Sequence, residues 1–66
     1  MDKIELASRI SWALETATDE GYINPNMGLD ALMNLQYEIL QFEFSEEEIE
    51  ELDENLIKSV FRSWTN

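Results

Sequence analysis

The sequence predicts an all-α fold, a compact single domain similar to a three-helix bundle, and three observations lead to this prediction. Apolar residues recur at helical spacing in three stretches of the chain. The only proline and both glycines lie within residues 21–28, between the first two stretches. Ser45 followed by Glu48 is the pattern of a capping box at the start of the third stretch. Residues 1–66 are few enough to form one acidic helical domain.

The first predicted helix covers residues 2–19. Asp2 is a good N-cap, with Glu5 three residues later as its reciprocal partner. Trp12 falls away from the apolar stripe, on the polar side of the helix, and Gly21 suits a left-handed helix end. The stripe itself contains Leu6, Ala7, Ile10, Ala13, Leu14 and Ala17.

The second predicted helix covers residues 29–43 and is apolar most of the way round. One face carries Ala31, Leu32, Leu35, Ile39 and Phe42, and a second face carries Leu29, Met33, Tyr37 and Leu40. The middle helix of a bundle contacts both of its neighbours, which widens its apolar arc. Two short neighbouring helices are too small to cover Met33, Tyr37 and Leu40 as well. Left uncovered, these residues would form a large exposed apolar patch, which monomers avoid. We therefore predict that these three residues form an oligomer interface in a homodimer.

The third predicted helix covers residues 46–64. The capping box of Ser45 and Glu48 sets its start, and Phe44 with Ile49 has the spacing of a hydrophobic staple. The expected core stripe consists of Ile49, Leu52, Leu56, Val60 and Trp64, widened by Ile57 and Phe61.

The residue types available leave little for catalysis. The chain has no Cys and no His, so it lacks thiolate ligands and the usual general base at neutral pH. It has no nucleophile motif, no glycine-rich phosphate loop and no zinc signature. Residues 19–30 have the length of a calcium loop, but Gly21 and Ile23 occupy ligand positions in it. We predict no enzymatic activity, no metal and no cofactor.

The predicted location is cytoplasmic. The charged N-terminus is followed by no apolar segment of a secretory signal. No apolar run exceeds three residues, which argues against a transmembrane helix. The absence of Cys fits a reducing compartment.

The charge balance predicts the class of partner. Fifteen acidic residues against four basic ones give a net charge of −11, which disfavours direct binding to nucleic acid or to an anionic membrane. It favours a basic protein. Hydrophobic residues make up 44% of the chain, so a core can form and the chain is not a disordered acidic tail.

Residues 43–54 contain the densest acidic stretch, and two interpretations compete. Carboxylates in the first turn of a helix complement its positive end, with Lys58 and Arg62 at the other end, so the stretch can be purely structural. Carboxylates on neighbouring turns also lie about 5–6 Å apart and suit a groove that normally holds phosphates. In the second interpretation the partner-binding residues are Glu47, Glu50, Glu51, Asp53 and Glu54, with Trp12 as an anchor.

Two functional hypotheses follow. The first is an acidic protein-binding module that docks on a basic, nucleic-acid-handling protein and inhibits or regulates it. Small phage-encoded inhibitors and bacteriocin immunity proteins act in this way, a comparison based on size and charge. Strict DNA mimicry is a narrower version, and Lys58 and Arg62 interrupt the negative face that it needs. The alternative is a helical structural or adaptor subunit that works through homo-oligomerisation or helix-to-helix assembly.

Overall fold

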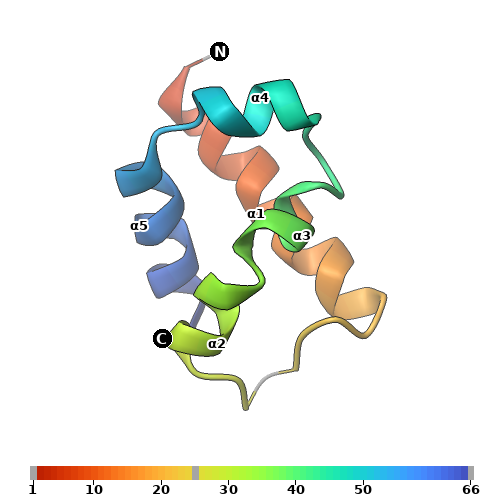
Figure 1. Ribbon diagram of the computed structural model, residues 1–66. Helices are drawn as coiled ribbons and strands as arrows, with labels where there is room; N and C mark the ends of the chain where they lie inside the picture. Colours follow the sequence, from red (N-terminus) through yellow and green to blue (C-terminus); the bar gives the residue numbers. More distant parts are fainter. Residues whose placement is uncertain (1, 25, 66) are drawn as a thin grey trace.

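The computed structural model describes residues 2–24 and 26–65, which form helices and connections without any strand (Figure 1). The helices are α1 (Lys3–Asp19), α2 (Leu29–Asn34), α3 (Gln36–Leu40), α4 (Glu46–Glu51) and α5 (Glu54–Thr65). The all-helical prediction is confirmed. The division into three helices is not, because the second and third predicted helices are each interrupted. The radius of gyration, 10.8 Å, matches the roughly 11 Å expected of a compact chain of this length.

α1 begins and ends where the sequence predicts. Asp2 caps it, and its side chain accepts a hydrogen bond of 2.7 Å from the backbone N–H of Glu5. Gly21 adopts a positive φ of 85°, the left-handed conformation in which glycine is not strained. The N–H of Tyr22 then reaches back to the carbonyl of Ala17 at 2.9 Å. This turn directs Ile23 into the core.

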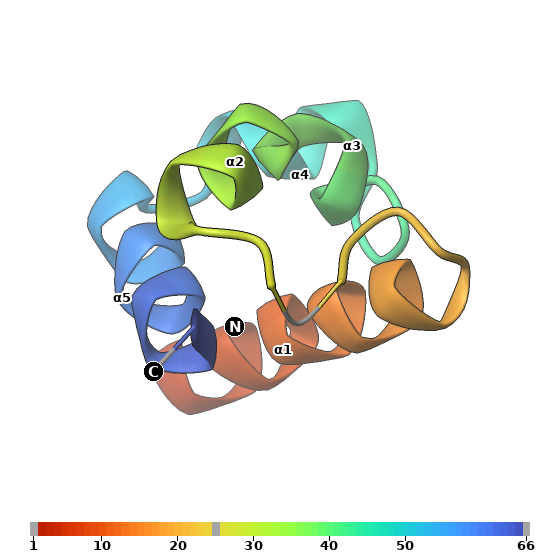
Figure 2. The ribbon, with the colours of Figure 1, turned by 90° about the horizontal axis from the view of Figure 1, so that it is seen from below.

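The second predicted helix is broken at Leu35. The backbone there has φ −99° and ψ 7°, so α2 ends and α3 starts in a new direction. Neither Gly nor Pro occurs between residues 29 and 43 to signal this break. Its consequence is visible in the packing, because α2 lies against α5 whereas α3 lies against α1 (Figure 2). One straight helix would not follow both neighbours in this way.

The third predicted helix is interrupted at residues 52–53. Leu52 is extended, with φ −72° and ψ 142°, and ends α4. Asp53 then acts as a cap for α5, because its side-chain Oδ1 accepts a 2.9 Å hydrogen bond from the N–H of Asn55. The carbonyl of Asp53 also accepts the hydrogen bond from the N–H of Ile57 at 3.0 Å.

The core lies between α1, α5 and the α2–α3 pair (Figure 2). Ala13 and Ala17 are fully buried, and their small side chains allow neighbouring helices to approach α1 closely. No polar or charged side chain is buried in the described part of the chain. The buried residues are Ile10, Ala13, Leu14, Ala17, Ile23, Leu32, Ile39, Leu40, Phe44, Ile57 and Phe61.

Candidate protein-binding surface

The start of α4 carries the predicted capping box. The hydroxyl of Ser45 accepts a hydrogen bond from the N–H of Glu48 at 3.2 Å, and the Glu48 carboxylate accepts one from the N–H of Ser45 at 3.0 Å. Phe44, just before the cap, is buried, and Ile49 is packed against the core. The capping box thus fixes where the acidic helix begins, and the apolar residues on either side of it fix where the helix lies.

Arg9 of α1 connects to the same helix start. Its guanidinium donates to the Glu48 carboxylate at 3.3 Å and to the backbone carbonyl of Glu43. It also lies over the ring of Phe44, 4.3 Å from the ring centroid. The sequence pattern missed this long-range group, because residues 9 and 48 are 39 positions apart and come together only in the folded chain, where α4 lies near the N-terminal half of α1 (Figure 1).

These contacts change the acidity of Glu48. The hydrogen bond from the Ser45 backbone, followed by that from Arg9, holds the pKa of Glu48 below its usual value of 4.5. The ionised form is therefore favoured in the folded state. Glu48 is structural in the first place, and its carboxylate is already engaged within the chain.

We expect the Glu48→Gln variant to lose part of the acid sensitivity of the wild type. A depressed folded-state pKa contributes stability that is present above the ordinary pKa and is lost as the pH falls through the folded pKa. The difference in Tm between wild type and variant should therefore be largest above about pH 5 and shrink below it. Thermal melts followed by circular dichroism from pH 7 to pH 3 measure this. A Tm difference that stays constant across the pH series would contradict the lowered pKa of Glu48. The matched control is Glu47→Gln, which removes a charge from α4 without touching Arg9.

The predicted carboxylates divide into two groups. Asp53 and Glu54 lie at the start of α5, where Asp53 is the cap and Glu54 belongs to the first turn. Their position is explained by helix stability alone. Glu47, Glu50 and Glu51 are exposed on α4, and their side chains form no hydrogen bond or ion pair with other residues in the described ranges. We call these three the free carboxylates.

The free carboxylates exceed what α4 needs for its own stability. Glu47 lies in the first turn, but Glu50 and Glu51 are the last two residues of the helix. Negative charge near a helix C-terminus is unfavourable, typically by about 0.3–1 kcal/mol at exposed sites. The structural interpretation therefore accounts for the start of the acidic stretch and not for its end.

Tyr37 lies next to the acidic helix rather than in an isolated apolar face. Its side chain is 45% exposed. Desolvation, together with the neighbouring carboxylates of Glu46 and Glu50, raises the pKa of Tyr37 above its usual value of 10.0. An exposed aromatic ring beside carboxylates is a surface that suits arginine and lysine side chains.

Trp12 projects from the outer face of α1 and is 59% exposed. On a regular helix it lies about 60° round the axis from Arg9, one turn further along. It is thus on the same side of α1 as the residue that holds α4. A tryptophan this exposed contributes little to the core and is available as an interface anchor.

The three residues predicted for the oligomer interface differ in their exposure within the single chain. Leu40 is fully buried in the core and Met33 is half-buried against it, whereas Tyr37 is exposed. The prediction of a shared surface assumed a continuous helix over residues 29–43. The break at Leu35 separates Met33, in α2, from Tyr37 and Leu40, in α3, and within α3 Leu40 is buried whereas Tyr37 is exposed.

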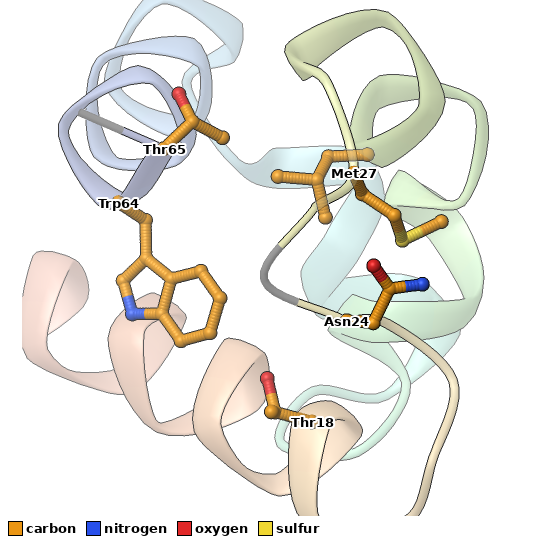
Figure 3. A pocket seen from close by; sticks show the side chains of 6 residues that line it. Thr18, Asn24, Met27, Trp64 and Thr65 are labelled. Carbon is orange, nitrogen blue, oxygen red and sulfur yellow. The ribbon is translucent and has the colours of Figure 1, made fainter.

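Trp64 was predicted to be in the core and instead borders a surface pocket (Figure 3). Its side chain is 39% exposed and is not part of the buried core. The pocket measures about 270 Å³ and is lined by Thr18, Asn24, Met27, Leu32, Trp64 and Thr65.

The polar groups of this pocket are used within the chain. The Thr18 hydroxyl donates to the Leu14 carbonyl, the Thr65 hydroxyl donates to the Arg62 carbonyl, and the Asn24 side chain accepts from Asn26. The pocket therefore offers no set of converging polar groups to a substrate. The described residues also contain no cluster of acidic side chains arranged to hold a metal ion. None of the helices in residues 2–24 and 26–65 is both long and apolar enough to cross a bilayer.

Searches against protein-family models, curated proteins and solved structures gave no match.

Proposed function

We propose that this protein is an acidic protein-binding module that docks on a basic, nucleic-acid-handling protein and inhibits or regulates it. The observation that carries the proposal is the set of free carboxylates on α4, exposed and without partners in the described part of the chain. Two of them stand where negative charge costs helix stability. A role in recognition accounts for that cost.

The chemistry of this surface favours a cationic partner. Carboxylates on adjacent turns lie about 5–6 Å apart, a spacing that suits a groove lined by Arg and Lys. Tyr37 at the edge of this surface adds an exposed ring for stacking. Trp12 supplies a second exposed aromatic side chain on the side of α1 that carries Arg9. The net charge of −11 speaks against direct contact with nucleic acid or an anionic membrane.

Charge reversal on α4 tests the proposal. The basic partner is first captured from the source cell at low salt and identified, and its association rate is then measured by surface plasmon resonance. Replacing Glu47, Glu50 and Glu51 by Lys should slow association about tenfold or more at low salt, because steering by the acidic surface is lost. The same variant should show a flatter dependence on salt concentration.

A matched control separates the site from net charge. Glu15, Asp19 and Glu20 are exposed at the opposite end of α1 from α4 (Figure 1). Replacing these three by Lys gives the same net charge as the α4 variant. If both variants slow association equally, only the total charge matters and α4 is not the docking surface.

The alternative function is a helical adaptor that acts as a homodimer. Tyr37 and, in part, Met33 remain at the surface to support it, while Leu40 is lost from the interface. Sedimentation at micromolar concentration distinguishes the two functions. The adaptor requires a species of about twice 7.7 kDa that Tyr37→Glu dissociates, whereas the acidic module does not depend on dimerisation, so a species of 7.7 kDa excludes the adaptor.

A further inference from the structure

α4 is the helix with the weakest attachment to the rest of the fold. None of its six residues is buried, whereas α1, α2, α3 and α5 each contribute buried side chains. A helix of this length is not stable by itself in water. Its position therefore depends on a small number of contacts.

Those contacts are concentrated at its first turn. Arg9 holds the Glu48 carboxylate and the Glu43 carbonyl, which lie on either side of the cap at Ser45. Beyond this point, Ile49 and Leu52 are only partly buried against the core. A groove of about 250 Å³ lies beside α4 and is lined by Leu6, Phe44, Glu48, Glu51 and Leu52.

The two ends of the segment allow it to move as one piece. Phe44, before the cap, is buried, and the extended Leu52 with the cap of α5 at Asp53 follows it. Both connections lack the continuous helical hydrogen bonds that would transmit an opening into α3 or α5. Segments with few buried apolar contacts open at lower free energy than the global unfolding of a protein.

We infer that α4 opens as a unit while α1 and α5 stay folded, and that the contact between Arg9 and Glu48 acts as the latch that keeps it closed. Opening uncovers the groove formed by Leu6, Phe44 and Leu52, which adds an apolar contact area beside the free carboxylates. A basic partner that binds Glu48 competes with Arg9 and so promotes opening. This last step rests on the proposed function, whereas the opening itself is a property of the free protein.

Native-state hydrogen exchange measured by NMR on the full chain tests the opening without a partner. The reporters for α4 are the amides of Ile49 and Leu52, which donate to the carbonyls of Ser45 and Ile49. The reporters for global unfolding are the amides of Leu14 and Phe61, in the buried faces of α1 and α5. We expect faster exchange at Ile49 and Leu52, with a shallow dependence on low urea concentrations, and a steep dependence at Leu14 and Phe61.

A mild core substitution adds a second test. Ile57→Val destabilises the whole fold and should accelerate exchange at Leu14 and Phe61 several-fold. It should leave the exchange rates of Ile49 and Leu52 unchanged, because the core stays folded when α4 opens. If all four amides share one urea slope and respond alike to Ile57→Val, α4 unfolds only with the rest of the protein and the inference is overturned.

The latch is tested by two variants that remove one charge each from α4. Glu48→Gln keeps an oxygen that can accept the hydrogen bond from the Ser45 N–H but breaks the ion pair with Arg9. It should accelerate exchange at Ile49 and Leu52 about two- to fivefold, the range for a half-exposed ion pair. In the wild type we expect salt to accelerate this exchange by screening the ion pair, and Glu48→Gln should abolish that acceleration. Glu47→Gln should keep that response to salt. If Glu48→Gln and Glu47→Gln exchange at the same rates and respond alike to salt, the contact between Arg9 and Glu48 does not keep α4 closed.

Discussion

The Leu40→Glu variant is expected to be unfolded at room temperature. Leu40 is fully buried, and no polar side chain in the described residues lies buried nearby to pair with a carboxylate. An unpaired buried charge, or the neutral acid that replaces it, costs several kcal/mol. A domain of this size has a total stability of roughly 3–10 kcal/mol. The substitution therefore removes most or all of the stability.

Circular dichroism and thermal melts measure this effect, and Gln41→Glu is the matched control. Gln41 is exposed at the end of α3, so Gln41→Glu introduces the same charge at the next position in the chain, where it faces water. We expect this variant to fold and to melt close to the wild type. Should Leu40→Glu give a folded protein with an unchanged Tm, the burial of Leu40 within a single chain would be wrong.

The second large effect is expected for Phe61→Ala, at about 3–5 kcal/mol. Phe61 has no exposed surface and is among the largest fully buried side chains, on the face of α5 that meets α1. Removing the ring leaves a cavity in the core that the surrounding side chains fill only in part. Urea denaturation should show a lower midpoint with an unchanged slope.

Trp64→Ala provides the comparison within the same helix. Because Trp64 is 39% exposed and borders the pocket, we expect a cost of only about 1 kcal/mol. Equal losses of stability in Phe61→Ala and Trp64→Ala would contradict the expectation that Phe61 contributes more. The sequence pattern ranks them the other way, since it places Trp64 in the central stripe and Phe61 at its margin.

The difference between Phe61 and Trp64 shows what a helical repeat can and cannot establish. Periodicity identifies the direction in which a side chain points, and both residues do lie on the inner side of α5. It does not show how fully the neighbouring elements cover each side chain. The prediction was therefore accurate for α1, whose buried residues all lie on the predicted stripe, and less accurate at the chain end.

The interruptions of the second and third helices have different origins. The break at residues 52–53 has a local cause, since Asp53 is a good N-cap residue and could have been recognised as one. The break at Leu35 has no local signal and arises because α2 and α3 pack on different helices. The second break is the one that places Met33 on a different helix from Tyr37 and Leu40.

The candidate surface was anticipated in part. Local patterns identified the capping box and the excess of carboxylates, since both depend on residues close together in the chain. The roles of Arg9 and Tyr37 depend on contacts between distant segments, which a single sequence does not provide. Asp53 and Glu54 were assigned to the binding surface because the start of α5 was not foreseen.

The wholly apolar core has a consequence for how this protein can change over evolutionary time. The residues that determine the fold and those that we propose to contact a partner are almost separate sets, with Arg9 and Glu48 as the main link between them. Substitutions on the outside can therefore accumulate with little loss of foldability, since exposed positions usually change stability by less than about 0.5 kcal/mol. Such a scaffold can follow a changing target or acquire a new one, while the interior tolerates only volume-conserving exchanges.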